Sequence, residues 1–168
     1  MREQRSDRRM DHDPPLTSDL SPLTSPLSPL TSRVVVAARA WIGTPYRHQA
    51  SVRGVGCDCL GLLRGVWREV MGAEPEPVPP YLPGWADPGG PDALGEAARR
   101  HLAGAPAPAP GRVLLFRWRD GHPARHCAIA TSAGAMIHAH DGAAVCEVAI
   151  RPWWGRHLCG VFRFPGAD

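Results

Sequence analysis

The residue best placed to carry out chemistry is Cys59, which stands at the expected start of an amphipathic helix. Asp58 is a favourable N-cap and Gly72 a favourable C-cap. Between them, apolar residues at helical spacing predict a helix over residues 59–71; these are Cys59, Leu62, Leu63, Val66, Trp67, Val70 and Met71. The unpaired N–H groups and partial positive charge of a helix start favour a thiolate, so Cys59 is a candidate nucleophile. The alternative is that Cys59 simply packs, because free cysteine is among the most buried residue types.

Three histidines are expected on one face of a β-hairpin, where one of them could serve as the base that a thiol nucleophile needs. A tight turn at residues 132–134 separates two predicted strands. In that register position 126 faces position 140, so His126, His138 and His140 share a face and His138 is diagonal to His126. A catalytic base also needs a third polar group to orient it. Geometry alone does not choose between His138 and His140 for that role.

Zinc binding is the alternative for the same cysteines. Cys57, Cys59 and the neighbours His126 and Cys127 are residue types that bind zinc. Structural zinc sites, however, usually leave about two to four residues between paired ligands, and only one residue separates Cys57 from Cys59. Five cysteines in 168 residues also lack the density of a disulfide scaffold. We therefore expect reduced thiols, with no metal and no other cofactor.

The elements that must position these residues are helices followed by strands. Two more helices are expected, over residues 33–42 with Ser32 as the cap and over 92–102. A loop over residues 73–91 carries Tyr81 and Trp85 and is long enough to wall a cleft. The predicted strands follow a stiff Ala/Pro spacer and cover residues 113–116, 127–131, 136–139, 145–150 and 158–164. This order predicts an α+β fold, with the cysteine helix packed on one face of an antiparallel sheet.

One folded domain is expected over residues 32–168, preceded by a disordered tail over residues 1–31 that is rich in Pro, Ser, Thr and Leu. The N-terminus shows neither an apolar signal segment nor a membrane span, so we expect synthesis in the cytoplasm without a signal peptide and no membrane insertion. The formal charge of +3 is mild and scattered, which argues against direct nucleic-acid binding.

Several segments resemble, in order and spacing, the NlpC/p60 family of cell-wall cysteine peptidases, over roughly residues 33–165. The chain departs from the family pattern at Leu60, where serine is usual, and at Arg112, where aspartate is usual. The matching segments are Gly43-Thr44-Pro45-Tyr46, Asp58-Cys59-Leu60-Gly61-Leu62, Gly111-Arg112-Val113-Leu114-Leu115-Phe116, His126-Cys127-Ala128-Ile129 and Met136-Ile137-His138-Ala139.

This resemblance implies a papain-like fold and hydrolysis of peptidoglycan stem peptides, typically between D-glutamate and meso-diaminopimelate. Cys59 would be the nucleophile, His126 the general base and acid, and His138 the residue that orients His126. The backbone N–H of Cys59 would help to hold the oxyanion. Tyr46 resembles a tyrosine that reaches the nucleophile in the family, although a packing role is also open. Supporting positions are Tyr46, Asp58 and His140.

A second resemblance concerns the branch of the family found with phage tails and gene-transfer particles. It rests on Trp153-Trp154, on residues 160–165 and on residues 65–69. It implies delivery by a phage-like tail, tail or baseplate proteins as partners, and action in the periplasm or cell wall of the target cell. Two alternatives stay open: a structural tail component that keeps the fold without activity, and a thiol amidase or acyltransferase that acts on another substrate.

Overall fold

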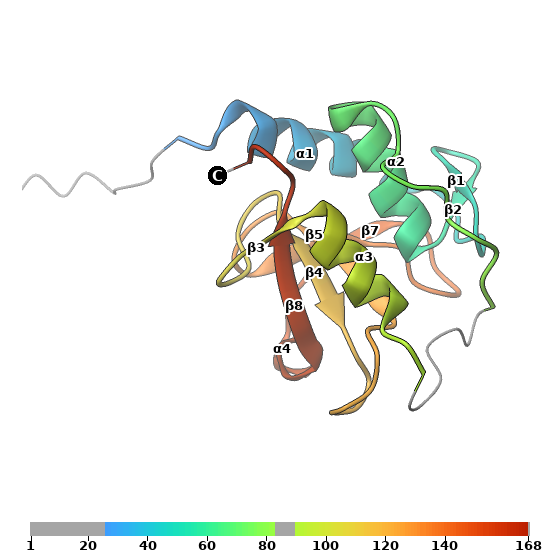
Figure 1. Cartoon of the computed structure of the whole chain (residues 1–168). Coiled ribbons are helices and arrows are strands. Elements are labelled where there is room, and N and C mark those ends of the chain that lie inside the picture. Colours follow the sequence, from blue (N-terminus) through green and yellow to red (C-terminus); the bar gives the residue numbers. More distant parts are fainter. Residues whose placement is uncertain (1–25, 83–89, 168) are drawn as a thin grey trace, which may run out of the picture.

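The computed structural model describes residues 26–82 and 90–167. Helices come mainly from the first half of the chain and the six-stranded sheet from the second half (Figure 1). The elements are α1 Pro29–Ala40, β1 Ser51–Val52, β2 Gly56–Cys57, α2 Cys59–Met71, α3 Ala93–His101, β3 Ala103–Gly104, β4 Val113–Phe116, β5 His126–Ala130, β6 Ala135–His138, β7 Cys146–Ala149, α4 Pro152–His157 and β8 Leu158–Arg163.

The large sheet has the strand order β3-β8-β4-β5-β6-β7, and every neighbouring pair is antiparallel. The mixed architecture with the cysteine helix on one face confirms the predicted α+β fold. In the β5–β6 hairpin Ile129 faces Ile137 and Ala130 faces Met136. This is the predicted register, and continued to the end of the hairpin it sets position 126 opposite position 140.

Alternate residues of the central strands point to opposite faces of the sheet, as the period of two requires. The residues on one face pack with the apolar residues of α1 and α2; they include Val113, Leu115, Cys127 and Ile129. Those on the other face form a second buried cluster, against which α4 contributes Trp154; they include Leu114, Phe116, Ala128 and Met136. The core therefore has two layers, one on each face of the sheet.

The packing of α1 on α2 depends on a glycine. A Cβ atom at Gly65 would lie 1.9 Å from Cζ2 of Trp41, so only glycine lets the indole of α1 sit against α2. Trp41 is 2% exposed, and its Nε1–H donates to Glu69 on α2 at 2.9 Å. A buried indole needs such an acceptor. This contact fixes α2, and with it the helix start that carries Cys59.

The first helix begins earlier than predicted, at Pro29 rather than Arg33. Proline is tolerated at the first helical position because its missing N–H would have no partner there. The Ser28 side chain, not that of Ser32, caps the helix and accepts from the backbone N–H of Thr31 at 3.2 Å. Leu30 packs against the core. The prediction of a tail through residue 31 was therefore wrong for residues 29–31, whereas residues 1–25 lie outside the described residues.

The remaining differences are smaller. Both ends of α2, both ends of β4 and the start of β8 match their predictions, and apart from the start of α1 the other predicted boundaries shift by one or two residues. Four short elements were not predicted: β1, β2, β3 and α4. Trp85, expected in the cleft wall, lies outside the described residues. Within the described residues, no helix is both long and apolar enough to span a membrane.

Candidate active site

Cys59 is the first residue of α2, as predicted, and Asp58 is its N-cap. The Asp58 carboxylate, 2% exposed, accepts from the backbone N–H of Gly61 at 2.7 Å and from that of Gln49 at 2.7 Å. It also accepts from the Tyr81 hydroxyl at 2.6 Å. Asp58 thus fixes the helix start and ties two loops to it, and its oxygens are occupied by these donors.

Only glycine fits at position 61, in the first turn of the nucleophile helix. A Cβ atom at this residue would lie 1.8 Å from the backbone oxygen of Ala50, so any other residue would push this loop away from α2. The neighbouring Ser51 hydroxyl donates to the backbone oxygen of Gly61 at 2.6 Å. The loop before the cysteine is therefore held directly against the first turn of α2.

His126 and His138 form a hydrogen-bonded pair at the end of the sheet where β5 begins. Nε2 of His126 lies 3.0 Å from Nδ1 of His138, and each histidine is 5% exposed. The two rings are nearly perpendicular, at 80°. His140 lies on the same side, with its ring centroid 6.1 Å from that of His126, but its Nδ1 contacts the backbone oxygen of Asp141. His138 is thus the hydrogen-bond partner of His126, the residue that the family resemblance named for this position and that geometry alone did not choose.

The pKa of the Cys59 thiol is held well below its ordinary value. The largest cause is a side-chain hydrogen bond with Cys127, and the nearby His126 acts in the same direction, whereas burial opposes both. The pKa of Cys127 is raised in turn, first by this hydrogen bond and then by its own burial. Cys59 is therefore the thiolate of the pair, and Cys127 is the thiol that donates to it.

Burial lowers the pKa of His138 to about 4, and the charges of His126 and His140 contribute to the shift. His138 is consequently neutral over most of the pH range in which proteins are stable. A neutral imidazole offers one lone pair, and the short contact puts that of Nδ1 opposite Nε2 of His126. His126 can then keep a proton on Nε2 and use Nδ1 for proton exchange with Cys59.

Cys57 has a different environment from Cys59, although only Asp58 separates them. It is completely buried, and burial together with the charges of Asp58 and Cys59 raises the pKa of its thiol to about 12. Within the parts of the chain that the structure describes, no group of three or more His, Cys, Asp or Glu side chains is arranged to hold a metal ion. The local geometry therefore separates one reactive thiol from one that packs.

A cleft opens on the Cys59 side chain. Its walls combine polar and apolar side chains, and every supporting residue named from the sequence contributes to them. The lining residues are Tyr46, His48, Asp58, Cys59, Leu60, Tyr81, Trp118, Arg125, His126, Ala139, His140 and Asp141.

Two tyrosines border the cleft. Burial, followed by the charges of Asp58, Cys59 and Asp141, raises the pKa of Tyr46 to about 12, so its hydroxyl keeps its proton. Tyr81 comes from the loop predicted to wall the cleft, and its backbone oxygen accepts from Gln49 and contacts Nε2 of His48. Tyr81 is thus attached to the helix cap Asp58 through its hydroxyl and to the loop of His48 and Gln49 through its carbonyl.

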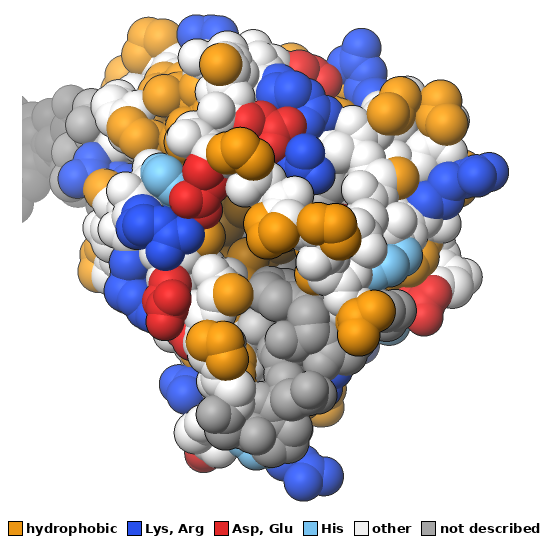
Figure 2. Space-filling view, turned by 45° about the vertical axis from the view of Figure 1, so that its right-hand side comes forward, with side chains coloured by type: hydrophobic (Ala, Val, Ile, Leu, Met, Phe, Trp, Pro, Cys, Tyr) orange, Lys and Arg blue, Asp and Glu red, His pale blue; other side chains and the backbone are white. Residues whose placement is uncertain are grey.

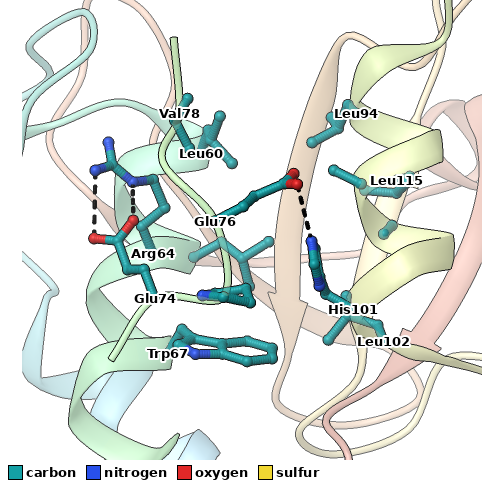
Figure 3. Close-up of a pocket in the computed structure, with 14 residues that line it drawn as sticks. Leu60, Arg64, Trp67, Glu74, Glu76, Val78, Leu94, His101, Leu102 and Leu115 are labelled. Carbon is teal, nitrogen blue, oxygen red and sulfur yellow. Dashed lines mark hydrogen bonds and ion pairs between the residues drawn. The ribbon is translucent and has the colours of Figure 1, made fainter. Parts of the chain in front are cut away.

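A second hollow lies between α2 and α3 and is far more apolar (Figures 2 and 3). Its floor includes Trp67 and Leu115, and the ion pair of Glu76 with His101 spans it at 3.2 Å. It shares Leu60 with the cleft, but it contains neither Cys59 nor the histidine pair. Leu60, at the position where the resembled family usually has serine, therefore forms an apolar wall between the two hollows.

Two features of the site were not predicted from the sequence. Cys127 was considered only as a zinc ligand, yet it is the hydrogen-bond partner of Cys59. Trp154 on α4 contacts both histidines of the pair. The alternation of β5 could have indicated the first, because Cys127 faces the helix side when His126 faces the other; no sequence pattern indicates the second.

A thiolate at a helix start, beside a histidine held by a second polar side chain on an antiparallel sheet, is the arrangement of a papain-like cysteine peptidase. Residues 43–163 match the sequence model of the NlpC/P60 family, and the chain belongs to that family. No curated protein matches the sequence significantly.

Solved structures agree with this assignment at the level of the fold. The NlpC/p60 domain of the peptidoglycan hydrolase SagA superimposes with a TM-score of 0.56 at 21% identity, over 80% of this chain and 98% of that domain. An NlpC/P60 family protein of Bacillus cereus gives 0.59 at 18% identity, over 83% of this chain and 41% of that one. A lipoprotein-like member from Staphylococcus aureus gives 0.57 at 20%, over 88% and 45%. The chain thus spans the whole SagA domain but less than half of the other two proteins.

Proposed function

We propose that this protein is a cysteine endopeptidase that hydrolyses peptidoglycan stem peptides, at the bond between D-glutamate and meso-diaminopimelate. The observation that carries the proposal is the thiol of Cys59, whose pKa is depressed beside His126. Membership of the NlpC/P60 family supports the substrate class. A fold kept only as a structural component has no physical need of an ionised thiol beside a histidine pair, so this arrangement favours activity over the structural alternative.

In the proposed reaction the Cys59 thiolate attacks the carbonyl carbon of the scissile amide, and the carbonyl oxygen becomes an oxyanion. The backbone N–H of Cys59, at the start of α2, is directed toward that charge by the helix geometry. Protonated His126 gives its Nδ1 proton to the leaving amine, and the carbon–nitrogen bond breaks to leave a thioester. His126 then takes a proton from water, the resulting hydroxide attacks the thioester, and Cys59 leaves as thiolate.

His138 supports this cycle without exchanging a proton with substrate. Its neutral Nδ1 accepts from Nε2–H of His126 and keeps the His126 ring oriented while Nδ1 of His126 changes its protonation state. The role is that of the carboxylate or amide that orients the histidine in other triads. A neutral acceptor does this without adding a negative charge to the site.

The proposal is tested by incubating the protein with purified peptidoglycan and identifying the released muropeptides by mass spectrometry. We expect fragments that end in D-glutamate, no release by Cys59→Ser, and most of the release preserved in Cys57→Ser, the matched control for a neighbouring buried thiol. Activity should survive excess EDTA and disappear with iodoacetamide. If Cys57→Ser is inactive and Cys59→Ser is active, or if cleavage occurs elsewhere in the stem peptide, the proposal is wrong.

Delivery by a phage-like tail to the wall of the target cell is the second part of the proposal. It is supported by the resemblance of Trp153-Trp154 and of residues 160–165 to the tail-associated branch of the family. Trp153 is 45% exposed, so an aromatic surface is available for tail or baseplate proteins. Purified tail particles should contain the protein in a fixed ratio to a tail protein. Its absence from the particles, with free protein in the cytoplasm, would contradict the proposal.

A further inference from the structure

Trp154 of α4 contacts both histidines of the site, in two different orientations. Its ring centroid is 5.5 Å from that of His126, with 30° between the planes, and 5.2 Å from that of His138, with 87° between the planes. The indole is thus roughly parallel to one imidazole and perpendicular to the other. The planes of the two imidazoles are 80° apart. One indole plane can therefore lie nearly parallel to the first imidazole and nearly perpendicular to the second.

The position of Trp154 is fixed by the second layer of the core, on the face of the sheet away from the α1 and α2 layer. Its ring packs edge-on against Phe116 at 4.9 Å and against Trp153 at 4.9 Å. His126 and His138 point to the same layer, because they share the alternation of Phe116, Ala128 and Met136. The histidine pair therefore has the α4 aromatic ring as its support on the face opposite the nucleophile helix.

We infer that Trp154 is a positioning residue, whose indole orients the His126–His138 pair and stabilises the cationic form of His126. The inference deepens the proposed function and rests on it, because it assigns a role within the same site. A cation within about 6 Å of an indole centroid is attracted by the negative face of the ring, and this attraction strengthens when water is excluded. At 5% exposure His126 has lost most of its water, and the near-parallel indole offers that face.

Charged and titratable groups surround His126 on several sides. Cys59 faces it from α2, and His138 and His140 face it from the β6 side. Cys127 follows it in β5, and Arg125 directly precedes the strand. Asp58 and Asp141 line the same cleft. The ion pairs of histidine within the described residues involve His48 and His101, not His126. Trp118 is a second indole stacked on His126, with 6.1 Å between the ring centroids and 23° between the planes. The imidazolium is thus stabilised by the Cys59 thiolate and by aromatic faces instead of a paired carboxylate, and Trp154 is the indole that contacts both His126 and His138.

The test measures the thiolate of Cys59 directly, by following iodoacetamide alkylation as a function of pH with peptide mass spectrometry to identify Cys59. Trp154→Leu removes the aromatic face, and we expect the rise of the alkylation rate to move to higher pH, with the rate near neutral pH about 3- to 10-fold lower. Trp154→Phe keeps an aromatic ring and should stay within about twofold of wild type. Trp153→Leu is the matched control, since Trp153 contacts Trp154 but neither histidine of the pair.

Folding is checked by circular dichroism and thermal unfolding, and Trp154→Met, whose flexible side chain adapts to irregular space without a ring, replaces the leucine variant if that one does not fold. An alkylation profile of Trp154→Leu or Trp154→Met equal to wild type would overturn the inference. So would an equal shift in Trp153→Leu, because the effect would then be general. Alkylation requires no peptidoglycan, so a wild-type protein that fails to cleave peptidoglycan would overturn the proposed function and leave this result interpretable.

Discussion

The neutral state of buried His138 predicts that the protein loses stability as the pH falls below the ordinary range of histidine. Burial, with the charges of His126 and His140, lowers the pKa of His138 from 6.5 to about 4. In the unfolded chain the imidazole binds a proton at the ordinary pKa, whereas the folded protein resists protonation until the lower value is reached. Between these values the unfolded state binds more protons, so the free energy of unfolding must decrease as the pH decreases.

The size of the effect follows from the shift. Each unit of pKa difference corresponds to about 1.4 kcal/mol, so His138 alone removes roughly 3 kcal/mol between the two pKa values. Total stabilities of domains are about 5–15 kcal/mol, which makes this loss easy to measure. The loss is absent above the ordinary pKa and complete below the folded pKa.

His138→Asn isolates this contribution. The asparagine Oδ1 takes the place of the imidazole Nδ1 and can accept from His126, but the side chain does not titrate. Urea unfolding at about pH 7 and about pH 4.5 should show that the wild type loses about 2–3 kcal/mol more than the variant. Losses from carboxylates are common to both proteins and cancel in the comparison.

The control is His140→Asn, which replaces an exposed imidazole on the same side of the sheet and should keep most of the wild-type loss, because burial is the largest cause of the lowered pKa of His138 and the charge of His140 a smaller one. If His138→Asn and wild type lose the same stability between the two pH values, His138 is not held neutral by the fold. The reasoning that makes it an acceptor for His126 would then be refuted.

Three further predictions concern the same site and the start of the domain. Cys127→Val removes the thiol that donates to the nucleophile, so the pKa of the nucleophile should rise and its alkylation near neutral pH should slow, read from a pH profile. His138→Ala should reduce turnover by up to about four orders of magnitude, and His140→Ala far less, in peptidoglycan cleavage assays at unchanged circular dichroism. Deletion of residues 1–25 should leave thermal stability unchanged, whereas deletion of residues 1–31, which removes the cap and first turn of α1, should cost about 2 kcal/mol or more.

The parts of the site that could be predicted from the sequence are those with local causes. A capping aspartate and a three-and-four apolar pattern are sufficient to place Cys59 at the first position of α2. A tight turn and the period of two in strands are sufficient for the register that brings His126 near His138. In each case the residues that determine the position belong to the same helix or the same hairpin as the residue that they position.

The parts that could not be predicted depend on chain segments far apart in the sequence. Trp154 reaches the histidines because α4 folds back between β7 and β8, and nothing local to Pro152–His157 specifies what this short helix faces. Geometry alone could not choose His138 over His140, because the choice depends on ring positions that a shared face does not determine; only the family resemblance named His138. The start of α1 was missed for another reason, because a proline that would interrupt a helix is acceptable at its first position.

The two consecutive residues His126 and Cys127 show why the site lies at the end of the sheet and not on either face. Cys127 points to the helix layer and donates to the Cys59 thiolate, while His126 points to the α4 layer and bonds to His138. Only at the strand end can the imidazole also approach Cys59. The nucleophile is therefore set by the packing of α2 on one layer, and the orientation of the base by the aromatic cluster of the other. Substitution of Trp154 in α4 should consequently change the protonation behaviour of the pair while leaving the Asp58 cap and the helix start intact.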